Sequence, residues 1–353
     1  MNRQYYLDLA RSGLRMPIGT DLVLHEQPDP EGVMHDGPAL GRVIETAARR
    51  YRTPLAIPLM DLRLEKGDLV ALLGHDTGHA ETFHFHECPP PSDLERARAS
   101  AKAPFGRRNQ AHIDSIRYIA TRTDLMPVGM AIGPFSLMTK LMADPITAVA
   151  VAGLGVSGLE DPSVRMAEVC LELAELAVHR SVAAQIEAGA RAVLICEPAA
   201  NRVYISPKQV EAGSDVFERF VMQPNLRVRG QMAEAGADLI FHDCGELTTA
   251  MVREFGTRLD PAILSLGGSR RLWEDAAVVP PSNVLFGNLP SKSFYSDASM
   301  PLEKVSAMAS ELIAVMRTAG HPHILGSECD VLHVPDVAAT IRAKVAALAG
   351  LSG

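Results

Sequence analysis

From about residue 120 to its end, the chain alternates short β-branched or apolar runs with longer amphipathic stretches. Such alternation is typical of repeated β–α units, in which helices cover a central parallel sheet. The pattern predicts an α/β fold of the (β/α)8 TIM-barrel type. The expected strands are residues 126–132, 192–196, 238–242, 262–266, 283–287 and 323–325, with 55–60 as an earlier one.

Helical patterns fill the gaps between these strands. Residues 162–188 carry apolar side chains at helical spacing, and residues 302–318 contain neither glycine nor proline. Both segments are followed closely by a glycine, a common helix stop. We expect Asp336 to cap a last helix that runs to Leu348.

The first 120 residues are less regular, because prolines break them into short pieces. We interpret residues 1–120 as an N-terminal extension over the barrel mouth together with the first elements, with helices at 93–101 and 109–121. Residues 121–353 then form the regular β–α units. Since no linker or repeat divides the sequence, we expect residues 1–353 to form a single barrel domain.

Composition narrows the classes of partner. The chain has 353 residues and a formal net charge of -8, which argues against a nucleic-acid surface because such surfaces need clustered lysine and arginine. The longest apolar stretches, such as 127–132 and 148–156, fall short of the roughly 18 residues that cross a bilayer. We therefore expect no membrane segment, and small molecules or a protein as partners.

The cysteines and the N-terminus indicate a compartment. Residues 1–6 lack the basic and apolar succession of an export signal, which favours a cytoplasmic protein. The 5 cysteines are an odd number and are widely spaced, so metal binding or burial is expected rather than disulfides.

Two segments place metal-ligating residue types where barrel strands end. His242 and Cys244 leave a strand two residues apart, so their side chains point the same way in an extended backbone. Cys329 follows the last expected strand, and closure of the barrel would bring it to the same ion. Imidazole and thiolate are preferred ligands of Zn²⁺, and three protein ligands leave one position open for substrate.

An open zinc position suggests thiol chemistry. A free thiol has a pKa of about 8.5 and is only slightly ionised at neutral pH, whereas a zinc-bound thiol loses its proton and remains nucleophilic.

Several motifs resemble those of the uroporphyrinogen decarboxylase superfamily. They are Gly-Pro-Phe-Ser-Leu at 133–137, His-Asp-Cys-Gly at 242–245, Gly287-Asn288 after a strand, and Cys329. Within that superfamily, His-x-Cys with a distant Cys resembles the zinc motif of methylcobalamin:thiol methyltransferases, including those that methylate coenzyme M. The resemblance implies a barrel, bound zinc, and methyl transfer from a methyl-corrinoid (cobalamin) on a separate corrinoid protein. Uroporphyrinogen decarboxylation is disfavoured, because an Arg-Gln-Ala-Gly-Arg motif is missing.

Two further residues are catalytic candidates. Glu197 follows the strand 192–196 and could be a fourth zinc ligand or bind substrate, with Glu328 as its competitor for the metal. Asn288 could hydrogen-bond a substrate or corrinoid group, or serve only as a turn residue.

Other polar clusters give weaker predictions of a functional role. His84, His86 and Cys88 alternate on one strand face, and we favour a non-metal role, with a lid that lends a histidine to the substrate pocket as an alternative. Asp61 could bind substrate or pair with Arg63. Glycines 267 and 268 with Ser269 could cradle an anionic group, while Cys170 and Cys196 are expected in the core.

The leading hypothesis is a zinc-dependent methyltransferase whose metal activates a small thiol to accept a methyl group from a methylated corrinoid protein. One alternative runs the other way, from a methylated ether, amine or thioether substrate to cob(I)alamin. Others are corrinoid-independent addition of a thiol to an electrophile, and a metal-storing or sensing protein. An interface on the N-terminal segment would make a homodimer.

Overall fold

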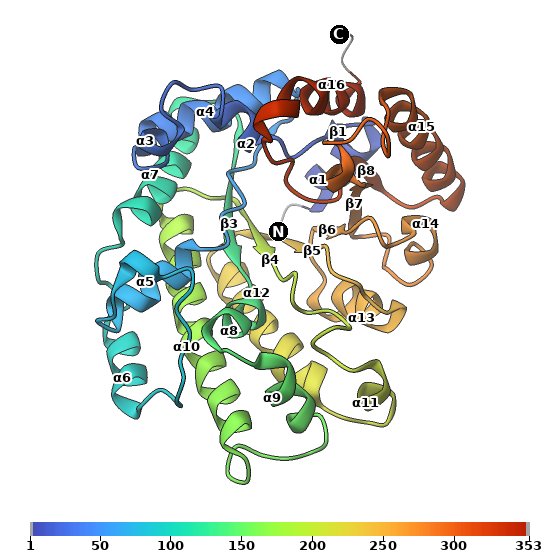
Figure 1. Ribbon diagram of the computed structural model, residues 1–353. Coiled ribbons are helices and arrows are strands. Elements are labelled where there is room, and N and C mark those ends of the chain that lie inside the picture. Colours follow the sequence, from blue (N-terminus) through green and yellow to red (C-terminus); the bar gives the residue numbers. More distant parts are fainter. Residues whose placement is uncertain (1–2, 351–353) are drawn as a thin grey trace.

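Parallel strands form the centre of the molecule, and helices surround them (Figure 1). The computed structural model describes residues 3–350. Within this range the strands are β1 Arg15–Met16, β2 Leu55–Ala56, β3 Met126–Ile132, β4 Ala192–Cys196, β5 Asp238–Asp243, β6 Ile263–Leu266, β7 Val284–Leu289 and β8 His323–Ser327.

The strands pair in the order β1-β8-β7-β6-β5-β4-β3-β2, and every pair is parallel. Among residues 3–350 no ladder joins β1 to β2, so the barrel is open at this seam. The Thr20 hydroxyl donates to the Ile57 carbonyl at 2.7 Å between the segments that follow these two strands. The predicted TIM-type barrel is confirmed.

Helices lie before, between and after the strands along the chain. They are α1 Arg3–Arg11, α2 Thr20–Leu24, α3 Pro30–Met34, α4 Gly37–Arg50, α5 Leu64–Leu72, α6 Pro91–Ala99, α7 Arg107–Arg122, α8 Pro134–Leu141, α9 Pro145–Ala152, α10 Pro162–Glu187, α11 Pro207–Glu211, α12 Gln223–Glu234, α13 Thr249–Glu254, α14 Leu272–Asp275, α15 Leu302–Ala319 and α16 Ala338–Ala349. Single turns of 3-10 or π helix lie at Thr77–His79, Glu218–Met222, Phe255–Leu259, Ser291–Ser293 and Pro335–Val337.

Local sequence explains where the long helices begin and end. The carboxylate of Asp161 accepts hydrogen bonds from the Ser163 and Val164 amides, and Pro162 opens the first turn of α10. Helix α15 ends at Gly320, whose φ of 68° lies in the left-handed region that favours glycine.

Alternation along the strands separates two cores. In β4, Val193 and Ile195 face the surrounding helices, whereas Ala192, Leu194 and Cys196 pack inside the barrel. Strand β5 alternates in the same way, and its register pairs His242 with Cys196 of β4. His242 therefore belongs to the inward-facing set at the carboxyl end of the strands.

Helix α1 closes the opposite end of the barrel. Tyr6 is fully buried in the inner core, and its hydroxyl donates to Asp238 at 3.0 Å, at the start of β5. Arg3 donates to the Pro261 carbonyl, just before β6. The N-terminal extension borders the mouth of the barrel, where Met60 and Leu62 line the same pocket as Cys244.

The expected elements from residue 126 onward match the structure closely, with ends that differ by a few residues. Two expectations are wrong in detail. The strand expected at 55–60 is only Leu55–Ala56, and β1, a strand of two residues, was not predicted. Asp336 does not cap α16: it lies in the 3-10 turn Pro335–Val337, and the helix starts after Val337 without a side-chain cap.

Candidate metal centre and its pocket

Three metal-ligating side chains meet at the carboxyl end of the barrel. His242 is the last residue but one of β5, Cys244 directly follows that strand, and Cys329 follows β8. One ligand atom from each of the three lies within 4.8 Å of the other two. In the part of the chain that the structure describes, this is the group of histidine, cysteine and acidic residues that could hold a metal ion.

Hydrogen bonding orients the histidine. Nδ1 of His242 lies 2.7 Å from the Ser265 hydroxyl on the neighbouring strand β6, while Nε2 is buried and has no hydrogen-bond partner among residues 3–350. A buried polar atom without a partner is costly, so Nε2 is suited to a ligand that the protein alone does not supply. With the ring proton on Nδ1, Nε2 keeps a free lone pair for a metal.

The two thiols influence one another. A hydrogen bond from Cys329, followed by the neighbouring His242, holds the pKa of Cys244 well below its usual range, and the same pairing raises the pKa of Cys329. Lys292 stands beside them: burial lowers its pKa, but Cys244, Glu328 and Cys329 raise it overall. The site therefore favours a thiolate with a cation next to it.

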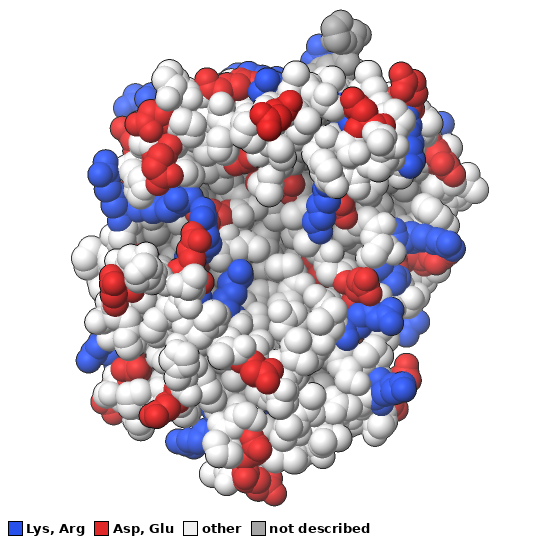
Figure 2. Space-filling model, in the orientation of Figure 1, with Lys and Arg blue, Asp and Glu red and all other residues white. Residues whose placement is uncertain are grey.

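A pocket of about 360 Å³ opens above the three side chains. Its polar lining comes from the three ligand candidates with Ser291, Lys292 and Asp330, and the rest of its wall is apolar. The apolar wall consists of Met60, Leu62, Pro198, Tyr295, Val331, Leu332, Val334 and Ile341. Figure 2 shows a hollow near the centre of this face, with basic and acidic side chains along its margin.

Glu197 is not among the clustered ligand atoms. Strand alternation turns Cys196 into the barrel and Glu197 away from it, toward the start of α8. Its carboxylate accepts hydrogen bonds from the Phe135 amide at 3.0 Å, the Ser136 amide at 2.8 Å and the Asn225 side chain at 2.8 Å. Burial raises the pKa of Glu197, and these hydrogen bonds oppose that rise.

The glycine loop after β6 binds the carboxylate of Glu328. The Gly268 amide donates to its carboxylate at 2.9 Å, and the Lys292 amide donates at 3.3 Å. The loop that, by its sequence, could cradle an anionic substrate group thus holds a side chain of the protein itself. Glu328 is engaged in joining the loops after β6, β7 and β8.

Asn288 braces the loop after β6. It follows a cis peptide bond at the end of β7, and its side-chain amide donates to the carbonyls of Gly267 at 2.7 Å and Arg270 at 2.9 Å. Its amide nitrogen is therefore occupied by two backbone carbonyls.

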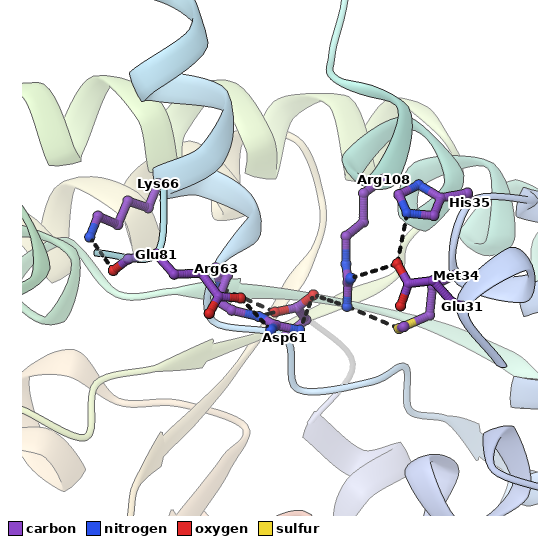
Figure 3. A network of polar contacts seen from close by, with 8 residues as sticks. All are labelled: Glu31, Met34, His35, Asp61, Arg63, Lys66, Glu81 and Arg108. Atoms are coloured by element: carbon purple, nitrogen blue, oxygen red, sulfur yellow. Dashed lines mark hydrogen bonds and ion pairs between the residues drawn. The ribbon is translucent and has the colours of Figure 1, made fainter. Parts of the chain in front are cut away.

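Asp61 belongs to a chain of ion pairs along the mouth. Figure 3 shows it between two arginines: Arg63 Nε lies 2.7 Å from Oδ1, and Arg108 Nη2 lies 2.7 Å from Oδ2. Asp61 therefore pairs with Arg63, which was one of the two roles expected for it. Burial raises the pKa of Asp61, but the two arginines outweigh it and the net change is a decrease.

The segment with His84, His86 and Cys88 lies apart from the metal cluster. Phe85 pairs with Met142, which anchors the segment beside α8. His84 lines a second pocket at the mouth, whereas His86 is exposed. Cys170 and Cys196 are both buried in the core, as predicted.

Asp330 was missed at the sequence level. It lines the metal pocket, and its Oδ1 atom is buried without a hydrogen-bond partner in the described chain. Burial, and then the nearby Asp21, raise the pKa of Asp330 to about 7. Its position directly after Cys329 was the available signal.

Residues 73–347 match the uroporphyrinogen decarboxylase (URO-D) family, and the chain belongs to that family. Its fold is also similar to a solved structure of a methyltransferase from Methanosarcina mazei, with 16% sequence identity, coverage of 98% of each chain and a TM-score of 0.66. No curated protein matches the sequence significantly. No helix within residues 3–350 has the length and apolar character that a membrane span requires.

Proposed function

We propose that this protein is a zinc-dependent methyltransferase, in which a small thiol bound at the metal accepts a methyl group from a methylated corrinoid protein. The observation that carries the proposal is the cluster of the His242 imidazole with the Cys244 and Cys329 sulfurs at the base of an apolar pocket. The family and the methyltransferase of similar fold support the class of reaction.

The donor set fits zinc. One imidazole and two thiols are ligands that Zn²⁺ prefers, and the unpartnered Nε2 of His242 is the kind of atom that a metal would satisfy. When bound, zinc would supply a low-pKa site for the acceptor thiol, so that its sulfur is present as a thiolate at neutral pH. The three protein ligands leave room for that thiol.

The charges at the site favour transfer of the methyl group to a thiol over transfer from a methylated substrate to cob(I)alamin. Two protein thiolates balance the charge of Zn²⁺, so a third thiolate adds a negative charge that needs compensation. Lys292 lies beside Cys244 and provides a positive charge at this point. A neutral ether or thioether substrate would gain little from the lysine.

The rim of the pocket supports docking of a corrinoid. Leu332, Val334 and Tyr295 line the pocket and remain 62%, 40% and 57% exposed. Exposed apolar side chains around a pocket are characteristic of interaction sites. We assign this rim to the corrinoid protein, whose methyl group would be presented to the sulfur below. The free state of all five cysteines fits a reducing, cytoplasmic location.

The test is metal analysis combined with methyl transfer. We expect one zinc per chain, and conversion of methylcobalamin to cob(I)alamin when a thiol is added, followed by its absorption spectrum. Chelation should abolish turnover, and zinc should restore it. A metal-free protein that turns over fully would overturn the proposal, and turnover of thiol with an epoxide in the absence of any corrinoid would favour the thiol-addition alternative.

A further inference from the structure

A separate pocket lies at the amino end of the barrel, opposite the metal centre. Its volume is about 720 Å³, against about 360 Å³ for the metal pocket. It is formed by α1, by the start of β1 at Arg15, by the end of α15 and by the start of β8 at His323. Small-molecule sites commonly have volumes of about 300–1,000 Å³, so this amino-end pocket is large enough for an organic ligand.

The charged side chains of the amino-end pocket are arginines. Arg11, Arg15 and Arg317 line it, and none of the described residues that line it is acidic. Arg11 is paired with Asp8 at 2.8 Å, on the exposed side of α1. The side chains of Arg15 and Arg317 form no ion pair or hydrogen bond within residues 3–350. Two guanidinium groups are therefore available to an anion.

Two histidines form part of the wall without adding charge. Nε2 of His321 lies 3.0 Å from the Asn283 carbonyl oxygen, and Nε2 of His323 lies 2.8 Å from the Gly287 carbonyl oxygen. Burial lowers the pKa of both rings, that of His323 to about 4, so both are neutral at pH 7. Their Nε2 hydrogens are donated to backbone, and the positive charge of the pocket comes from the arginines alone.

Apolar side chains make up much of the remaining wall. Met316 and Leu325 are buried, and Leu14 and Ile313 are half-buried. A fully hydrated ion such as inorganic phosphate gains nothing from such a wall, whereas a ligand with an apolar part is stabilised by leaving water there. The wall therefore favours a ligand that is charged at one end and apolar at the other.

We propose that the amino-end pocket binds a small amphipathic anion. Its carboxylate or phosphate is held by Arg15 and Arg317, because paired guanidinium N–H groups match the oxygens of both kinds of anion. Its apolar body lies against Leu14, Ile313 and Met316. The pocket shares no lining residue with the metal pocket, so the inference goes beyond the proposed function and does not depend on it.

The experiment is calorimetric titration of the purified protein with simple probes. Hexyl phosphate and hexanoate carry both features of the expected ligand, 1-hexanol has only the apolar chain, and inorganic phosphate has only the charge. At least one of the two amphipathic anions should bind about 10-fold or more tightly than either 1-hexanol or inorganic phosphate.

The variants remove one feature at a time. Arg317→Gln, on the exposed side of α15, and Arg15→Gln should each weaken binding of the preferred anion about 10-fold and leave 1-hexanol within about twofold. Ile313→Ser should weaken the anion and 1-hexanol alike, because it shortens the apolar wall. Arg122→Gln is the matched control: Arg122 is also exposed and without an ion pair within residues 3–350, but it lies on α7 outside the pocket.

Three results would overturn the inference. Unchanged affinity in both Arg15→Gln and Arg317→Gln would place the anion elsewhere on the protein. Inorganic phosphate that binds as tightly as hexyl phosphate would mean that the arginines take a free anion and the apolar wall has no part. Binding to phosphatidic acid vesicles that requires both arginines, without binding of either monomeric anion, would make this face a membrane contact instead of a small-molecule site.

Discussion

The Nδ1 atom of His242 lies 2.7 Å from the hydroxyl oxygen of Ser265, on adjacent strands of the barrel. The contact orients the imidazole through Nδ1, and Nε2 is left buried without a hydrogen-bond partner among residues 3–350, in a side chain that clusters with the two cysteines. Partners of this kind orient metal-binding histidines and choose which nitrogen carries the proton.

Ser265→Ala should weaken zinc binding by about 10- to 100-fold, because the imidazole loses the partner that orients it. The affinity is measured by competition with a chromophoric chelator. Ser310→Ala, on the exposed face of α15, is the control and should match wild-type protein. Unchanged zinc affinity in Ser265→Ala would show that packing alone orients the ring.

Cys244→Ala and Cys329→Ala should each lose bound zinc and methyl transfer, because each removes one of the three clustered ligand atoms. Cys88→Ala is the matched control: Cys88 is also partly buried but lies outside the cluster. Metal content per chain is measured on purified protein. A Cys244 or Cys329 variant that retained stoichiometric zinc would contradict the ligand assignment.

Glu197→Gln separates a structural role from metal ligation. The variant should retain zinc, because the Glu197 carboxylate is occupied by the amides at the start of α8 and by Asn225. Its free energy of unfolding should fall by about 2–3 kcal/mol, because hydrogen bonds to a buried charged group are lost and a side-chain amide now faces backbone donors. Urea unfolding and metal analysis give the two readings. Loss of zinc with unchanged stability would make Glu197 a ligand.

The sequence was most informative where periodicity and residue type agree. The regular strands and the proximity of His242, Cys244 and Cys329 could be predicted, because strand alternation and closure of the barrel bring these side chains to one place; their role as metal ligands stays a prediction. The same alternation, applied from β4 onward, would have turned Glu197 away from the metal. The partners of Glu328 and Asn288 could not be read, since they depend on how loops from different strands approach one another.

Glu65 should make stability depend on pH. It is 1% exposed, Ser181 donates to its Oε1 atom at 2.8 Å, and burial raises its pKa to about 7 from 4.5. In the unfolded chain Glu65 ionises near pH 4.5. The stabilisation that the protonated form gives the folded protein is therefore complete below pH 4.5, and it is lost as the pH rises through 7. The full difference between the pKa of Glu65 in the folded chain and in the unfolded chain corresponds to about 3 kcal/mol of folding free energy.

Glu65→Gln removes this titration while keeping a neutral side chain of the same size. The stability of wild-type protein relative to Glu65→Gln should therefore decline by about 2–3 kcal/mol between pH 5 and pH 8. Urea unfolding of both proteins across that range provides the comparison. Parallel pH profiles would mean that Glu65 has the same pKa in the folded and unfolded chains.

Asn288→Ala should loosen the loop after β6 and only indirectly affect the metal. The Asn288 amide holds the carbonyls of Gly267 and Arg270, and the alanine leaves both without this donor. We expect the free energy of unfolding to fall by about 2 kcal/mol and amide hydrogen exchange to accelerate at 267–270, with zinc retained. If exchange in this loop stayed slow while thiol binding fell, Asn288 would contact the substrate, because a purely supporting residue would act through the loop that it holds.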